Sequence, residues 1–248
     1  MTFKDLFSGH ASDYARYRPR YPAGLYDHLA SLCERRDLAW DCATGNGQAA
    51  IELAKRFARV IATDASKKQL DEAPRIEKIE YQVWPAEKTE LSTRSVDLVT
   101  VAQALHWFDF ARFGQEVRRV ASPGCMLAVW TYSVAQITPE IDAVTEQLYN
   151  IGLKGFWEYE RTWVDKGYEG IPLPIVGETR PRFEMKVDMT LAHWIAYLGT
   201  WSAVKKAVET TGRNPVDGMR AEFEKAWGEP GSARPVTYPL NVRIGRVS

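Results

Sequence analysis

Short apolar runs alternate with amphipathic helical segments along the first half of this 248-residue chain. Segments such as 48–57 and 110–120 place apolar residues at the i, i+3, i+4, i+7 spacing of one helix face. The apolar runs between such segments have the length and content of buried strands. They lie at 38–42, 59–63, 79–84, 95–102 and 125–131. This alternation predicts an α/β fold, in which a parallel sheet carries helices on both faces.

The last third of the chain has a different pattern. Residues 183–189 and 236–244 alternate apolar and polar side chains with period two, which is typical of half-exposed or antiparallel strands. Pro239 cannot donate a ladder hydrogen bond, so we expect a bulge or an unpaired side there. Between these strands we expect one helix over 194–208 and another over 219–227. Together the patterns predict a mostly parallel sheet of seven strands whose last strand is antiparallel.

Residues 134–181 interrupt the alternation. They begin with a helix through Ile141, Val144 and Leu148 and continue into a stretch rich in aromatic residues and glycine. We expect a single domain over 1–248, in which 134–181 is a helical and loop insertion that covers the substrate side as a lid. The alternative is an ordinary part of the core that packs under a long loop.

Charge and composition narrow the class of partner. The 32 Lys and Arg residues balance 32 Asp and Glu residues, so no overall field attracts nucleic acid or an anionic membrane. No stretch approaches the roughly 18 apolar residues of a membrane span, and the N-terminus lacks a signal-peptide pattern, so we expect a cytoplasmic protein. The three cysteines have no C-x-x-C spacing that would suggest a zinc site or a disulfide framework. We therefore expect a monomer or homodimer that binds a small molecule, and no metal.

Glycines and acidic residues follow the predicted strands, and open parallel sheets bind ligands at the carboxyl ends of their strands. After the first strand, Gly45 and Gly47 allow a tight turn and close approach to a ligand. The second strand ends at Asp64, 17 positions after Gly47, where a carboxylate would accept hydrogen bonds from a ribose diol. Glu87 follows the third strand and is placed to accept a hydrogen bond from an adenine amino group. The pattern indicates a cofactor that contains a nucleoside.

The glycine spacing favours an adenosyl cofactor over a dinucleotide. A dinucleotide fingerprint requires G-x-G-x-x-G, whereas residues 43–50 read ATGNGQAA. An oxidoreductase that uses a nicotinamide nucleotide is therefore the weaker alternative. A non-catalytic module that binds a nucleoside is a second alternative.

The motifs DCATGNGQ (41–48) and SVDLVTVAQALHWFD (95–109) resemble those of class I S-adenosylmethionine-dependent methyltransferases of the type 11 group. FSGHASDYARYRPRYP (7–22) is similar to the N-terminal signature of the trans-aconitate methyltransferase-like branch. The resemblance spans nearly the whole chain and implies a Rossmann-like fold, with S-adenosyl-L-methionine as cofactor. It further implies methyl transfer to a small molecule, and the branch points to a carboxylic acid. Ala43 departs from the first glycine of the family motif.

The resemblance also implies roles for individual residues. Asp41 would brace the first turn through backbone N–H groups, and His106 would meet the substrate as a hydrogen-bond donor or general base. The aromatic stretch of the insertion adds further candidates for the substrate wall. Cofactor contacts are expected from Tyr14, Arg18, Ala43, Gly45, Gly47, Asp64, Ala65, Ala86, Glu87, Ala102 and Gln103, and substrate contacts from His106, Trp107, Trp157, Trp163 and Trp201.

Overall fold

An eight-stranded sheet in the order β3-β2-β1-β4-β5-β8-β6, with β7 paired to β8 beyond that path, forms the centre of the protein. The computed structural model describes residues 19–248, so Tyr14 and Arg18 lie outside the described residues. The first five strands run parallel to their neighbours, and β8 runs antiparallel to β5. The strands are β1 (Leu38–Cys42), β2 (Arg59–Thr63), β3 (Ile79–Gln82), β4 (Val96–Ala102), β5 (Ala121–Thr131), β6 (Ile175–Thr179), β7 (Arg182–Met189) and β8 (Arg234–Val247).

Helices cover both faces of this sheet. Successive side chains of each strand point to opposite sides, and both sides carry apolar residues that the helices bury. Ala39 of β1 is buried in a core cluster with residues of α2 and α3, while Trp40 is buried with residues of α5 and α7 on the other side. The predicted architecture of a mostly parallel sheet between helices is confirmed. The helices around the sheet are α2 (Ala23–Leu32), α3 (Gln48–Leu53), α4 (Lys67–Asp71), the 3-10 helix η1 (Leu105–Trp107), α5 (Phe110–Val120) and α7 (Arg161–Asp165).

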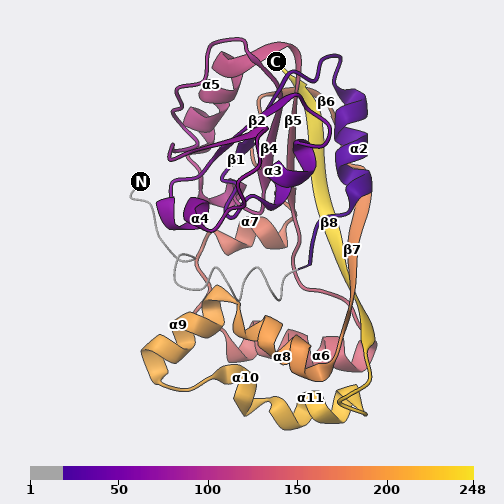
Figure 1. The fold of residues 1–248 in the computed structure, drawn as a ribbon. Coiled ribbons are helices and arrows are strands. Elements are labelled where there is room, and N and C mark those ends of the chain that lie inside the picture. The colour runs from indigo at the N-terminus through magenta and orange to yellow at the C-terminus, as the bar shows by residue number, and fades with distance from the viewer. Residues whose placement is uncertain (1–18) are drawn as a thin grey trace.

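The long strand β8 extends beyond the sheet and, with β7, reaches a second layer of helices (Figure 1). Its first half pairs with β7, and only the half that begins at Asn241 pairs with β5. Thr237 exchanges both backbone hydrogen bonds with Gln136, so the backbone nitrogen of Pro239, two residues on, faces the same side. Among residues 19–248, no strand partner lies opposite Pro239 on that side, as expected for a proline.

The second layer is built from the helices that lie on either side of β7 in sequence. In it α11 packs on α6 and α8, and Ile141, Trp194 and Phe223 are buried. The single helix expected over 194–208 is wrong, because Trp201 takes an extended conformation (φ −66°, ψ 135°) and separates α8 from α9. The elements of this layer are α6 (Pro139–Gln147), the π-helix η2 (Leu148–Gly152), α8 (Leu191–Gly199), α9 (Ser202–Thr211), α10 (Pro215–Gly218) and α11 (Arg220–Trp227).

The predicted insertion over 134–181 contributes to three parts of the structure. Its first portion, α6 and η2, belongs to the helical layer, and α7 packs beside η1. Its last portion forms β6, which pairs with β8 and brings the sheet to eight strands rather than the predicted seven. The sequence IVGET of β6 gave no strand signal, because four of its five residues are exposed and no apolar alternation is needed there.

Candidate functional site

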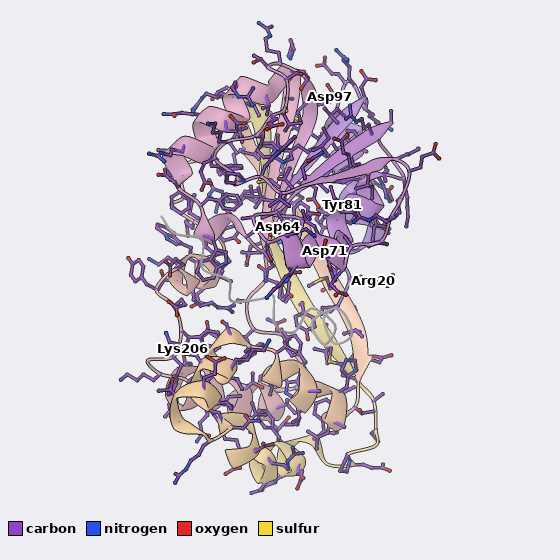
Figure 2. All side chains as sticks on the ribbon, turned by 60° about the vertical axis from the view of Figure 1, so that its left-hand side comes forward. Arg20, Asp64, Asp71, Tyr81, Asp97 and Lys206 are labelled. Carbon is purple, nitrogen blue, oxygen red and sulfur yellow. The ribbon has the colours of Figure 1, made fainter. Side chains whose placement is uncertain are left out.

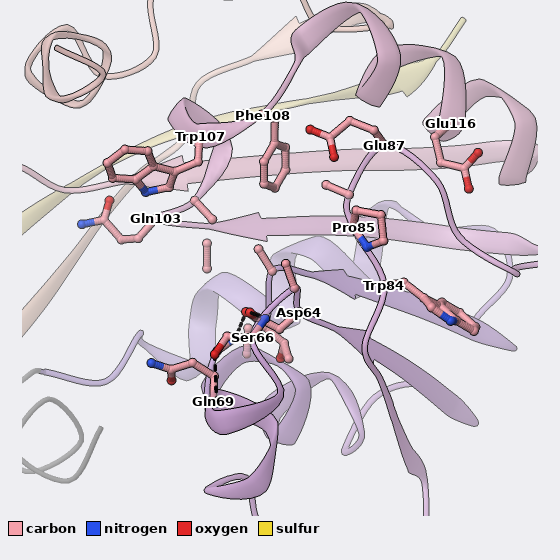
Figure 3. A pocket seen from close by; sticks show the side chains of 18 of the residues that line it. Asp64, Ser66, Gln69, Trp84, Pro85, Glu87, Gln103, Trp107, Phe108 and Glu116 are labelled. Atoms are coloured by element: carbon pink, nitrogen blue, oxygen red, sulfur yellow. Dashed lines mark hydrogen bonds between the residues drawn. The ribbon is translucent and has the colours of Figure 1, made fainter. Parts of the chain in front are cut away.

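A cavity of about 1170 Å³ lies at the carboxyl ends of β1 to β4 (Figure 3). This volume exceeds the roughly 300 to 1,000 Å³ of a pocket for one small molecule, so the cavity has room for two ligands. In Figure 3, Asp64, Ser66 and Gln69 form the lower wall, opposite Trp107 and Phe108. Within residues 19–248, no three His, Cys, Asp or Glu side chains cluster in a way that would hold a metal ion. In the same range no helix is long and apolar enough to cross a membrane.

The cavity brings together most of the residues that the sequence singled out. Some of the expected residues do not line it. Gly47 is one of them: its φ is +86°, and a Cβ there would lie 2.7 Å from the Tyr81 hydroxyl, so its part is to form the turn. The expected residues that line the cavity are Ala43, Gly45, Asp64, Ala65, Ala86, Glu87, Ala102, Gln103 and Trp107. Those that do not line it are Gly47, His106, Trp157, Trp163 and Trp201.

Asp64 connects the turns that follow β1 and β2. Its carboxylate accepts hydrogen bonds from the backbone N–H of Gly45 at 2.9 Å and of Ser66 at 2.8 Å. Asp97 lies at the opposite end of the sheet, as Figure 2 shows. There its carboxylate accepts hydrogen bonds from the backbone N–H groups of Asp37 and Leu38. Asp64 therefore stands at the ligand-binding end of the sheet, where its carboxylate also holds the two turns in place.

The turn after β1 rests on the buried carboxyl group of Asp41. This group accepts hydrogen bonds from the hydroxyls of Thr44 and Thr100, so side-chain hydroxyls brace the turn where backbone N–H groups were expected. Burial raises the pKa of Asp41 to about 6 against these hydrogen bonds. Ala43 has a φ of +54°, the left-handed region that glycine occupies without strain. The family glycine is thus absent at a position whose backbone conformation still favours it.

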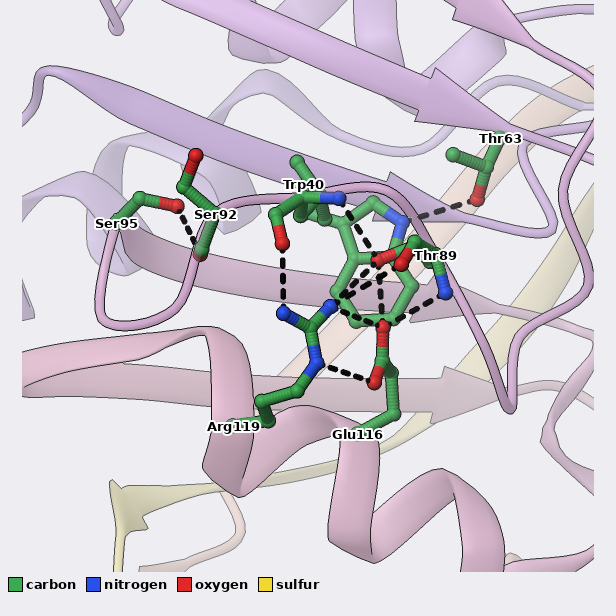
Figure 4. Close-up of polar contacts among 8 residues, drawn as sticks. Trp40, Thr63, Thr89, Ser92, Ser95, Glu116 and Arg119 are labelled. Carbon is green, nitrogen blue, oxygen red and sulfur yellow. Dashed lines mark hydrogen bonds and ion pairs between the residues drawn. The ribbon is translucent and has the colours of Figure 1, made fainter.

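The loop after β3 carries Ala86 and Glu87 and is fastened to α5. Glu87 accepts from the Asp109 N–H at 2.9 Å at the start of that helix. Two turns further along, the Glu116 carboxylate accepts from the Thr89 N–H at 2.7 Å and from its hydroxyl at 2.6 Å (Figure 4). Arg119 binds Glu116 and donates to the Leu91 carbonyl at 2.7 Å. Sequence reasoning missed this clamp, because nothing local pairs residue 89 with residue 116.

Gln103 and His106 follow β4, and both side chains are engaged. The Gln103 amide exchanges two hydrogen bonds with the backbone of Tyr132 and accepts a third from Thr131. The His106 Nδ1 lies 3.0 Å from the Tyr168 hydroxyl, and the ring contacts Trp107 with 4.7 Å between ring centroids. Burial, aided by the charge of Arg161, lowers the pKa of His106 to about 3. His106 is consequently neutral at pH 7 and a weak proton acceptor.

The aromatic residues of the expected lid divide between two places. Trp157 and Trp201 lie 5.7 Å apart by ring centroids and contact Tyr149 in the helical layer. Trp163 instead packs edge-on against Phe110 at 5.7 Å, on the face of the sheet that carries α5. The structure thus brings Trp157 and Trp201 together and separates Trp163 from them.

Comparison with known proteins gives consistent matches. Residues 40–129 match the Methyltransf_11 family, described as a methyltransferase domain. A protein of Dictyostelium discoideum named as a methyltransferase is 34% identical over 230 residues, which cover 91% of this chain and 87% of that protein. A solved structure from Anaeromyxobacter dehalogenans, described as a type II methyltransferase, is 41% identical with a TM-score of 0.86, over 93% of this chain and 98% of that one. The phospholethanolamine N-methyltransferase 2 of Haemonchus contortus, solved with S-adenosylhomocysteine, covers 100% of this chain and 60% of its own at 14% identity and a TM-score of 0.53, which shows a shared fold.

Proposed function

Since this chain belongs to the class I S-adenosylmethionine-dependent methyltransferases, we propose that it methylates a small organic molecule in the cavity at the carboxyl ends of β1 to β4. The cavity volume of about 1170 Å³ carries this proposal, because it admits a second ligand beside the methyl donor. Membership in the family favours methyl transfer over the nicotinamide-nucleotide oxidoreductase that the sequence had left as an alternative. Methyl transfer to an acceptor would distinguish an enzyme from the non-catalytic module.

The residues at the cavity fit S-adenosylmethionine. Ala43 and Gly45 leave the floor free of bulky side chains, and the Asp64 carboxylate at the end of β2 is placed to accept from the ribose hydroxyls. Ala65 borders the same site, while Ala86 and Glu87 form the wall for adenine. These assignments are supported by the position of each residue on the cavity wall.

The end of β4 would meet the methionine part of the donor. Ala102 and Gln103 both line the cavity there. Because the Gln103 side-chain amide is bound to Tyr132 and Thr131, only its backbone carbonyl is available to the amino group of the cofactor. The side chain thus serves to hold the turn.

S-adenosylmethionine supplies a methyl group on a positively charged sulfur, which needs no metal to react. The chain's own residues bind the two ligands, align them and exclude water. We place the acceptor on the side of Trp107 and Tyr21, which line the cavity beyond the end of β4. A carboxylic acid is the first acceptor class to test, supported by the similarity of residues 7–22 to the trans-aconitate branch. An ionised carboxylate needs no general base, which agrees with the low pKa of His106.

Calorimetric titration of S-adenosylmethionine into Asp64→Asn tests the cofactor site. Losing a charged hydrogen-bond acceptor costs about 1.5 to 3 kcal/mol, so we expect affinity to fall about tenfold or more. Asp71→Asn is the matched control, because Asp71 pairs with Lys67 on the outside of α4 and should leave affinity unchanged. Equal affinities of the two variants would contradict the assignment. A panel of small carboxylic acids, followed by mass spectrometry for methyl esters, then tests the acceptor class, and methylation only of amines or thiols would refute it.

A further inference from the structure

The strand β7 is an edge strand that runs beside β8 toward the helical layer (Figure 1). It pairs with β8 on one side, and among residues 19–248 no strand pairs with its other side. Thr237 of β8 turns both of its backbone groups to Gln136, so Lys186, which lies opposite Thr237, turns its own N–H and C=O groups away from β8. Because this direction alternates along a strand, every second residue of β7 presents its backbone groups at the open edge.

The residues that present these groups carry charges of alternating sign, and all of them are exposed. They are Arg182, Glu184, Lys186 and Asp188. The side chains between them point to the opposite face, where Met185 is buried in the core. Within the chain the Lys186 ammonium lies 2.6 Å from the Glu184 carboxylate, so opposite charges already pair along this face. Charges on an edge strand discourage pairing with a strand whose own charges do not match, and their order determines which partner is accepted.

This order of charges is complementary to itself in an antiparallel pair. When a second copy of β7 lies alongside with the two Met185 residues opposite each other, Glu184 of each copy faces Lys186 of the other. Arg182 faces Asp188 in the same way, so every charge of the strand meets an opposite charge. These are also the residues whose N–H and C=O groups face outward, so each facing pair exchanges two backbone hydrogen bonds.

The neighbouring registers bring like charges together. Only shifts by two residues keep the outward backbone groups of the two strands opposite each other. A shift in one direction places Arg182 opposite Lys186 and the two Glu184 residues opposite each other. A shift in the other direction places Glu184 opposite Asp188 and the two Lys186 residues opposite each other. Since like charges directly opposite are destabilising, the strand favours the register centred on Met185.

We propose that the protein forms a two-fold symmetric homodimer in which β7 of one copy pairs antiparallel with β7 of the other about Met185. The symmetry follows because the same surface serves on both copies. The pairing joins the two sheets into one and covers the edge that is open in the single chain. No residue of β7 lines the cavity at the carboxyl ends of β1 to β4, so the dimer leaves that site accessible.

Sedimentation of charge-reversal variants tests this arrangement. Lys186→Glu places glutamates opposite each other in both central pairs, and Glu184→Lys places lysines there. Each variant should raise the dissociation constant of the dimer about tenfold or more. When one variant is fluorescently labelled and the two are mixed, we expect a heterodimer of wild-type affinity, because every glutamate at these positions then faces a lysine. Lys78→Glu is the matched control, since Lys78 is exposed beside β3 at the opposite edge of the sheet and should leave the dimer unchanged.

Three results would overturn the proposal. A wild type that sediments only as a monomer at about 100 µM would mean that the charges keep the edge unpaired. A dimer that neither reversal weakens would use another surface, and a mixture that stays monomeric would exclude the register centred on Met185. If either variant does not fold, Arg182→Glu and Asp188→Lys replace the pair and should give the same pattern. Because no ligand is present, the result does not depend on the methyltransferase proposal.

Discussion

Replacing Ala43 by glycine should stabilise the protein, although glycine usually weakens a folded chain. Ala43 has a φ of +54°, where the Cβ of an L-residue approaches its own backbone and costs roughly 1 to 2 kcal/mol. Glycine removes that strain but adds backbone freedom to the unfolded chain, which costs about 0.4 to 1 kcal/mol. The net expectation is a gain of about 0.5 to 1 kcal/mol, or about 1 to 4 °C in Tm for a chain of this length.

Urea unfolding and thermal melts of Ala43→Gly measure this gain, and Ala65→Gly is the matched control. Ala65 also lines the cavity but is exposed and has no positive φ, so its replacement should lower stability by about 0.5 to 1 kcal/mol. The two variants should therefore change stability in opposite directions. If Ala43→Gly is destabilised as much as the control, the left-handed strain at the turn does not exist and the reasoning fails.

Three further expectations concern the carboxyl group under the turn, the loop clamp and the lid. Because burial raises the pKa of Asp41 to about 6, its contribution to stability is present below about pH 4 and lost as the pH rises through 6. The stability of Asp41→Asn relative to the wild type should then grow by about 2 kcal/mol between about pH 4 and 7, and a constant difference in urea unfolding would contradict this. Glu116→Ala should release Thr89 and weaken S-adenosylmethionine binding about five- to tenfold by calorimetry, while the exposed Glu90→Ala should not; equal affinities would refute the clamp. If 152–172 closes over ligands, limited proteolysis there should slow when donor and acceptor are present, and equal cleavage would argue against a lid.

The parallel sheet could be predicted from sequence because its signals are local. A buried strand flanked by helices needs an uninterrupted apolar run, and β1 and β2 match the predicted ranges 38–42 and 59–63 residue for residue. The position of Asp64 at the cavity follows from a local signal too. Asp64 comes directly after a predicted strand, and ligands bind at the carboxyl ends of parallel strands. The exposed strand β6 gave no such signal, because its side chains need not be apolar.

Contacts between residues distant in sequence could not be predicted from these patterns. The hydrogen bond that orients His106 comes from Tyr168, and no spacing rule relates a tyrosine to a histidine 62 positions away. The same limit applies to the clamp between residues 89 and 116. Such bonds form only because parallel strands bring their carboxyl ends to one edge, where every following turn contributes side chains.

The aromatic stretch 156–168 shows why composition alone cannot assign its side chains to one surface. Glu158 pairs with Lys206 of α9 at 2.7 Å, so the chain is still tied to the helical layer at that point. Trp163, five residues later, packs on the α5 face of the sheet. Trp157, before this crossing, packs against Trp201, whereas Tyr168, after it, is buried against His106. The chain passes from the helical layer to the α5 face of the sheet between Glu158 and Trp163. Residues close together in sequence therefore pack in different parts of the protein on either side of this point. Which aromatic residues can reach the acceptor depends on where the chain makes this passage.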